Sequence, residues 1–168
     1  VLGAGTPLAD VYLSSCAAAG VPVYRRRGGG GAVLLSPGNL IITACYDARR
    51  KAFPTQWIGP IAEAVARALR ALGLHSACVQ GLGDVAVGSR KVLGSSLCAS
   101  RQVALYQGSL LVNPDLDLIP RFLPHPSREP DYRAGRSHRE FLTSLEQEGY
   151  RGGLAPLKAA LYAELKQV

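Results

Sequence analysis

The sequence lacks several features that would assign it at once to a familiar class. No apolar run reaches the length that spans a bilayer, and no basic segment followed by an apolar one opens the chain, so we expect neither a membrane partner nor a signal peptide. None of the four cysteines is spaced as C-x-x-C, and three scattered histidines do not predict a metal site. These features favour a reducing, cytoplasmic environment with mostly buried thiols.

Acidic residues are scarce as well. Twelve Asp and Glu stand against 19 Lys and Arg, which gives a formal net charge of +7. A basic surface attracts nucleotides, acidic proteins or nucleic acids. No DNA- or RNA-binding motif accompanies the charge, so we expect no nucleic-acid partner. The 168 residues, 48% of them hydrophobic, are typical of one globular domain with a core of its own.

The hydrophobic pattern predicts a mixed α/β domain with a largely antiparallel sheet flanked by helices. The clearest helix begins at Trp57, with Pro60 in its first turn and Gly73 as its C-terminal cap. The turns Ser36–Gly38 and Gly88–Arg90 each join two strands. We expect strands over 20–26, 32–36, 39–46, within 75–100 on both sides of the second turn, and over 102–113; helices over 57–73, 114–123, 139–149 and 154–168; and a surface loop over 124–138.

One stretch, YRRRGGGGAVLLSPGNL, places three arginines directly before four glycines. Glycines let backbone N–H groups approach an anion closely, and arginines add planar donors for phosphate or carboxylate. Apolar residues on both sides favour a fixed loop over a tail. No Lys-Ser or Lys-Thr pair follows the glycines, which excludes a Walker A loop. A plain glycine hairpin with exposed arginines is the alternative interpretation.

A second stretch, GDVAVGSRKVLGSS, places Asp84 before one strand and Lys91 at the start of the next. Small residues at Gly94, Ser95 and Ser96 leave space above the sheet. A lysine there offers a compact charge for a carboxylate or phosphoryl oxygen. For an isolated lysine, the simpler interpretation is a surface residue in a hairpin.

Taken in order, these stretches resemble the lipoate–protein ligase and octanoyltransferase family, relatives of biotin–protein ligase. The resemblance covers nearly the whole chain and also includes QGSLLVN and GRSHREFLTSL. It implies a single class II synthetase-like catalytic domain over 1–168. It further implies that ATP, with Mg²⁺, activates lipoate to lipoyl-AMP, and that the lipoyl group passes to a lysine of a lipoyl carrier domain.

The resemblance also implies roles for individual residues. Lys91 would contact the acyl carbonyl and the phosphate. The chemistry itself suggests a role for Asp84: the attacking amine must lose a proton, and Asp84 is a candidate acceptor, with binding of Mg²⁺ or capping of a turn as the alternatives. The residues implied to hold ATP and the lipoyl-adenylate are Arg25, Arg26, Arg27, Gly28, Gly29, Gly30, Gly31, Ala32, Gly94, Ser95, Gly108 and Ser109.

Departures from the family pattern keep alternatives open. LLSPG stands where many members have His-Asp, Gln107 replaces a histidine, and no Lys-Trp motif occurs near the end of the sequence. We expect no C-terminal accessory domain. The abrupt start VLGAG favours a missing N-terminal segment. The alternatives are a ligase that needs an accessory subunit, a divergent ligase subgroup, an ATP-independent octanoyl or lipoyl transferase with a thioester on Cys78, and a non-catalytic lipoyl- or nucleotide-binding module. The arginine-rich stretch Pro126–Arg139 is either a solvated loop, a docking surface for an acidic carrier or a phosphate site.

Overall fold

A computed structural model of the protein describes residues 1–50 and 55–168. Its centre is a five-stranded sheet of order β1-β5-β4-β3-β2, in which every neighbouring pair is antiparallel. The mixed α/β fold with an antiparallel sheet is therefore confirmed. The strands are β1 (Asn39–Asp47), β2 (Ala77–Gln80), β3 (Asp84–Val87), β4 (Arg90–Ala99) and β5 (Val103–Leu111).

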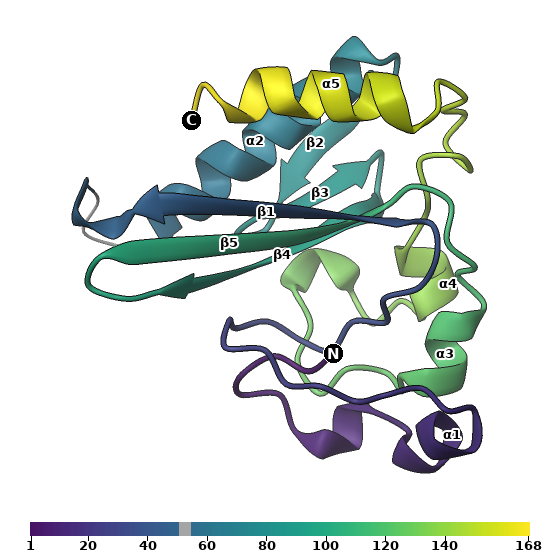
Figure 1. Cartoon of the computed structure of the whole chain (residues 1–168). Coiled ribbons are helices and arrows are strands. Elements are labelled where there is room, and N and C mark those ends of the chain that lie inside the picture. The colour runs from purple at the N-terminus through teal and green to yellow at the C-terminus, as the bar shows by residue number, and fades with distance from the viewer. Residues whose placement is uncertain (51–54) are drawn as a thin grey trace.

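Two helices cover one face of the sheet (Figure 1). Helix α2 (Thr55–Ala71) buries most of its apolar stripe, with Ile61, Val65 and Leu69 fully buried, and this burial is the main reason for its stability. Helix α5 (Leu154–Leu165) packs against α2 and is joined to it by the Arg67–Glu164 ion pair. The predicted helix at 57–73 is confirmed, but it begins earlier, so that Pro60 lies beyond its first turn.

The N-terminal segment lies on the other side of the sheet, together with the short helices α1 (Leu13–Ala18), α3 (Leu118–Phe122) and α4 (His138–Phe141) (Figure 1). These parts form a second, smaller apolar cluster of their own. The 3-10 turns are η1 (Leu8–Asp10), η2 (Ala48–Arg50) and η3 (Asp131–Arg133). This second cluster leaves part of the sheet face open, and the candidate site lies there.

The strands predicted over 20–26 and 32–36 are wrong. Arg25 makes only an isolated parallel bridge with Leu2, and 32–36 is irregular. Val21 and Leu34 pack against the second cluster instead, whereas Val23 and Leu35 are exposed. Burial against a loop-rich cluster produces the same hydrophobic pattern as a buried strand.

Other predictions also need correction. The helix predicted at 139–149 is only α4, because the chain is extended from Leu142 and pairs with Lys91. The helix predicted over 114–123 begins only at Leu118. The predicted surface loop 124–138 contains η3, where Arg133 is only 4% exposed. Cys45 is exposed, so its thiol is not part of the core.

Within the described residues, no helix is both long and apolar enough to cross a membrane.

Candidate active site

Lys91 and Asp84 face each other across the β3–β4 hairpin. Nζ of Lys91 lies 2.8 Å from Oδ2 of Asp84, and the two side chains are 22% and 18% exposed. The hydroxyl group of Tyr132 donates a hydrogen bond of 2.9 Å to the same carboxylate oxygen. These three residues, called the Lys91 centre below, form a half-buried ion pair held by a third polar group. The structure thus brings together the two residues for which the sequence predicted a catalytic role.

A β-bulge in β4 sets the direction of the Lys91 side chain. The pairing of β3 with β4 shifts between Val85 and Ala86, which leaves Val92 as an extra residue on β4. Such a bulge turns the side chains on one side of it to the opposite face of the strand. Lys91 consequently lies over Gly94, where a Cβ atom would be 3.0 Å from both Cε and Nζ of the lysine. Glycine at this position therefore makes room for the ammonium group.

Tyr132 was not found by sequence analysis, because its partner Asp84 lies 48 residues away and no local pattern signals the contact. Burial, followed by the negative charge of Asp84, raises the pKa of Tyr132 above its ordinary value. The phenol therefore stays protonated and donates to the carboxylate. Its ring packs against Phe141, with the ring centres 5.1 Å apart.

Phe141 contacts both Lys91 and the arginine-rich segment Pro126–Arg139 that precedes Phe141 in the sequence. The guanidinium carbons of Arg133 and Arg136 lie 4.9 Å and 5.2 Å from the centre of the Phe141 ring, and Nζ of Lys91 lies 5.9 Å from it. The Arg136 guanidinium also donates to the carbonyl group of Ser89, which ties the segment to the β3–β4 turn. This packing fixes the segment beside the lysine.

The arginine-glycine run forms a shaped loop, called the glycine loop below (residues 25–31). Nη2 of Arg26 donates to the carbonyl oxygens of Gly29 and Gly31, and Gly30 has a φ of 88° that disfavours other residues. Nε and Nη1 of Arg26 are buried without a hydrogen-bond partner in the described parts of the chain. Burial also lowers the pKa of Arg26. Buried donors without an acceptor are costly, so this guanidinium is suited to receive an anion.

The neighbouring residues of the loop differ in role. Gly28 crosses β4 so closely that a Cβ atom there would lie 2.9 Å from Oγ of Ser96. The Arg25 guanidinium is already bonded to three carbonyl groups of the N-terminal segment, those of residues 3, 4 and 6. Arg25 therefore anchors the loop. Arg27 is exposed and makes no hydrogen bond or ion pair with any part of the chain that the structure describes.

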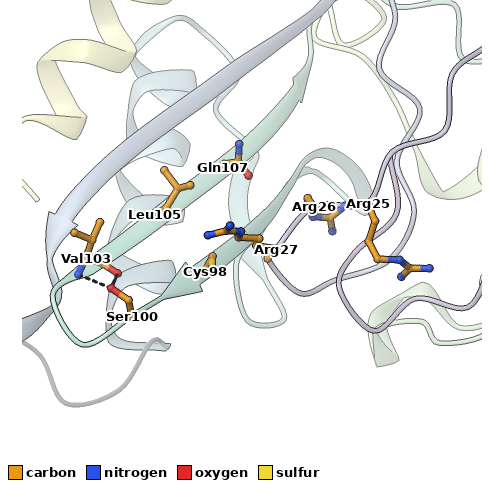
Figure 2. A pocket seen from close by; sticks show the side chains of 9 residues that line it. Arg25, Arg26, Arg27, Cys98, Ser100, Val103, Leu105 and Gln107 are labelled. Atoms are coloured by element: carbon orange, nitrogen blue, oxygen red, sulfur yellow. Dashed lines mark hydrogen bonds between the residues drawn. The ribbon is translucent and has the colours of Figure 1, made fainter.

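An open groove of about 460 Å³ continues from the glycine loop along the β4–β5 hairpin. Figure 2 shows Arg27 reaching over β4 beside Cys98, with Gln107 on the adjacent strand. Leu105 and Val103 supply an apolar part. The groove combines guanidinium groups with an apolar wall, as a site for an acid with an aliphatic chain requires.

Because side chains alternate between the two faces of a strand, the remaining predicted residues of β4 and β5 do not all face the groove. Ser109 lies opposite Gly94 and accepts a hydrogen bond of 3.0 Å from the amide of Asn39, so it faces the Lys91 centre. Ser95 donates instead to the carbonyl group of Gly83, and Ser96 takes the position beside the glycine loop.

Three further predicted residues lie away from the groove. A Cβ atom at Gly108 would contact Tyr106, a residue of the core under α2. Ala32 packs against the second apolar cluster. Cys78 lies on β2, opposite Ala86, and does not line the groove, whereas Cys98 does.

The carboxylate of Asp84 is compatible with a bound magnesium ion. Both contacts of Asp84 described above use Oδ2, while Oδ1 is directed toward Gly94. Mg²⁺ commonly binds through one or two carboxylates together with substrate phosphates, so Oδ1 fits as a single protein ligand. No group of three His, Cys, Asp or Glu residues that could hold a metal ion occurs in the described residues.

Comparison with known proteins assigns the family. The profile of the Lipoyl protein ligase A/B catalytic domain matches residues 1–166, and the chain belongs to this family. A search of curated proteins finds no match.

Several solved structures share the fold. The bipartite lipoate protein ligase of Thermoplasma acidophilum, described with its E2 lipoyl domain, superposes with a TM-score of 0.84 at 24% identity over 99% of this chain. A lipoate-protein ligase A bound with ATP gives 0.81 at 22% identity, also over 99% of this chain. The Aquifex aeolicus biotin protein ligase with biotin and ATP gives 0.58 at 14% identity over 77% of this chain. The chain spans 65%, 66% and 49% of the length of these three chains. At these identities the likeness establishes the fold.

Proposed function

We propose that this domain ligates lipoate to a lysine of a lipoyl carrier domain, with ATP as the activating substrate. The observation that carries the proposal is the continuity of the Lys91 centre, the glycine loop and the groove along a single strand. Gly94 lies beneath the lysine, Ser96 beneath the loop and Cys98 in the groove. Four residues of a strand span about 13 Å, enough for an acyl chain with its carboxyl end at Lys91.

The proposed chemistry has two steps. The lipoate carboxylate attacks the α-phosphorus of ATP and releases pyrophosphate, and the carrier amine then attacks the acyl carbon and releases AMP. The ammonium group of Lys91 stabilises the charge that develops on the carbonyl and phosphoryl oxygens, and it is already in place before the reaction begins. A magnesium ion, when bound with ATP, would supply further charge neutralisation at the phosphates.

The buried donors of Arg26 are the second part of the proposal. They lie in the loop between the groove and the Lys91 centre, where a carboxylate or phosphate oxygen would satisfy Nε and Nη1. Asp84 holds Lys91 before substrate binds, and Tyr132 keeps Asp84 in place when the lysine turns to the substrate. We assign Asp84 this positioning role and, through Oδ1, a role as the magnesium ligand.

The test is the intact mass of an apo lipoyl domain incubated with this protein and lipoate, with and without ATP. Lipoylation only with ATP supports a ligase. Lipoylation from an acylated carrier without ATP would instead establish a transferase, and no modification under any condition would leave only a binding module.

The second candidate is an ATP-independent transferase with a cysteine thioester. Cys98 is favoured over Cys78 as the nucleophile because Cys98 lines the groove beside Arg27. An acyl-enzyme adduct in the mass spectrum that disappears in Cys98→Ala and persists in Cys78→Ala would support this candidate. The absence of any adduct after incubation with an acylated carrier would exclude it.

A further inference from the structure

The turn between β2 and β3 displays an unusually exposed leucine next to the Lys91 centre. Leu82 is 78% exposed, more than any other large hydrophobic residue among the described residues, and it lies two positions before Asp84. Exposed apolar side chains are common on protein surfaces, so exposure alone does not indicate a function. The surroundings of the leucine provide the argument.

The turn is held rigidly while its tip points to solvent. A Cβ atom at Gly83 would overlap the Ile58 side chain of α2, so the backbone packs directly on that helix. Oγ of Ser95 donates a hydrogen bond of 2.9 Å to the carbonyl oxygen of Gly83. Gly81 has a φ of 56° and lies against the ring of Tyr132. Leu82 is therefore presented in a fixed position, and little conformational entropy is lost when a partner contacts it.

The charge beside the turn specifies the partner. The ring of Tyr132 lies beside Gly81 of the turn, and the carbonyl oxygen of Tyr132 accepts a hydrogen bond of 2.7 Å from Arg136. The other contacts of Arg136 described here are also to carbonyl groups, those of Ser89 and Arg133, and Arg128 lies four residues before Tyr132 in the sequence. Residues 121–139 hold five arginines and two carboxylates. An apolar anchor with a basic rim fits an acidic protein surface that has an apolar residue at its centre.

We infer that Leu82 is the apolar anchor on which the acidic, lysine-bearing protein substrate docks. The inference rests on the proposed function, because Asp84, which directly follows the β2–β3 turn, belongs to the Lys91 centre where the amine would react. The apolar residue of the partner contacts Leu82, its acidic rim faces Arg128 and Arg136, and its lysine reaches the acyl carbon. Leu82 then governs binding of the protein substrate and has no part in activation of the acid.

The experiment separates activation from docking. Hydroxylamine, a small amine, captures an activated acyl group without any docked protein, so hydroxamate formation from lipoate and ATP measures activation alone. Transfer to a recombinant apo lipoyl domain measures both steps. The variant is Leu82→Gln, and the matched control is Leu154→Gln, which alters a leucine that is 51% exposed at the start of α5, on the helix-covered side of the sheet.

We expect Leu82→Gln to form hydroxamate at the unaltered rate and to raise the KM for the lipoyl domain about tenfold, a typical loss for an interface anchor. Leu154→Gln should change neither quantity. An unchanged KM in Leu82→Gln would overturn the inference and leave the proposed function standing. The same holds if the variant changes only self-association in size-exclusion chromatography. If the unaltered protein forms hydroxamate but does not modify the lipoyl domain, the inference is overturned and only the activation step of the proposed function is left standing. Absence of hydroxamate from the unaltered protein would overturn the proposed function and the inference with it.

Discussion

The side chain of Lys91 lies directly over Gly94, three residues further along the same strand, so that a Cβ atom at this position would lie only 3.0 Å from Cε and Nζ of the lysine. Residues three apart on a regular strand face opposite sides of the sheet. The extra residue at Val92 puts these two on the same face. The position of the proposed catalytic lysine therefore depends on one bulge and one glycine.

This relationship predicts a large effect of a small substitution. Gly94→Val should push Lys91 away from the reacting centre and lower the transfer rate about 100-fold, since displacements of about 1 Å have such effects. Gly5→Ala is the control, because a Cβ atom at Gly5 would contact nothing within 4 Å. The measurement is the initial rate of lipoyl-domain modification. A Gly94→Val rate within twofold of the unaltered protein would contradict the assigned geometry.

The glycine loop allows a comparison of two adjacent glycines. Gly30→Ala places a residue with a side chain at a φ of 88° and against the Arg26 guanidinium, so we expect a loss of about 1–2 kcal/mol in the free energy of unfolding. Gly29→Ala should be nearly neutral, because space is open there and no positive φ is required. Urea unfolding of both variants measures the difference. Equal stabilities would show that the loop does not hold this conformation in solution.

The raised pKa of Tyr132 predicts that the free energy of unfolding depends on pH. Because burial and Asp84 raise its pKa in the folded protein, the native state holds this proton more tightly than the unfolded chain does. The stabilisation is complete below the ordinary tyrosine pKa of 10.0 and is lost as the pH rises toward the folded value. Between pH 9 and pH 11 the unfolding free energy should fall more steeply in the unaltered protein than in Tyr132→Phe. Parallel profiles would contradict the assignment.

The reactivity of two cysteines tests where lipoate binds. Cys98 and Cys45 both lie opposite Leu105, on its two neighbouring strands, but Cys98 lines the groove and Cys45 does not. Lipoate at saturating concentration should slow alkylation of Cys98 by iodoacetamide and leave Cys45 unaffected, as peptide mass spectrometry would show. Equal protection of both thiols, or of neither, would contradict binding of the acid in this groove.

The sequence predicted the parts of the fold that follow local rules. The periodic apolar positions of α2 and the turn at Gly88 led to the correct helix and hairpin, because both depend on neighbouring residues. The predicted strands over 20–26 and 32–36 are wrong, since residues such as Val21 and Leu34 are apolar because they pack against the second cluster, without a pairing partner.

In the candidate site, too, the features that depend on neighbouring residues were predictable, and those that depend on distant segments were not. One hairpin motif indicated both Lys91 and Asp84, but not the ion pair that joins them. Ser95 is predicted where Ser96 faces the loop, because strand alternation cannot be counted reliably before the bulge is known. Tyr132 and Leu82 depend on contacts or exposure that arise only when distant segments meet.

The most direct test of the proposed function is the effect of Lys91→Ala on the mass of an apo lipoyl domain incubated with lipoate and ATP. Lys158→Ala, a change of an exposed lysine on α5, is the control. Loss of one oriented charge at the transition state costs about 10²–10³ in rate, so Lys91→Ala should leave the lipoyl domain essentially unmodified while Lys158→Ala and the unaltered protein lipoylate it equally. Lipoylation by a folded Lys91→Ala protein at the rate of the unaltered protein would contradict the assignment of Lys91 as the catalytic residue.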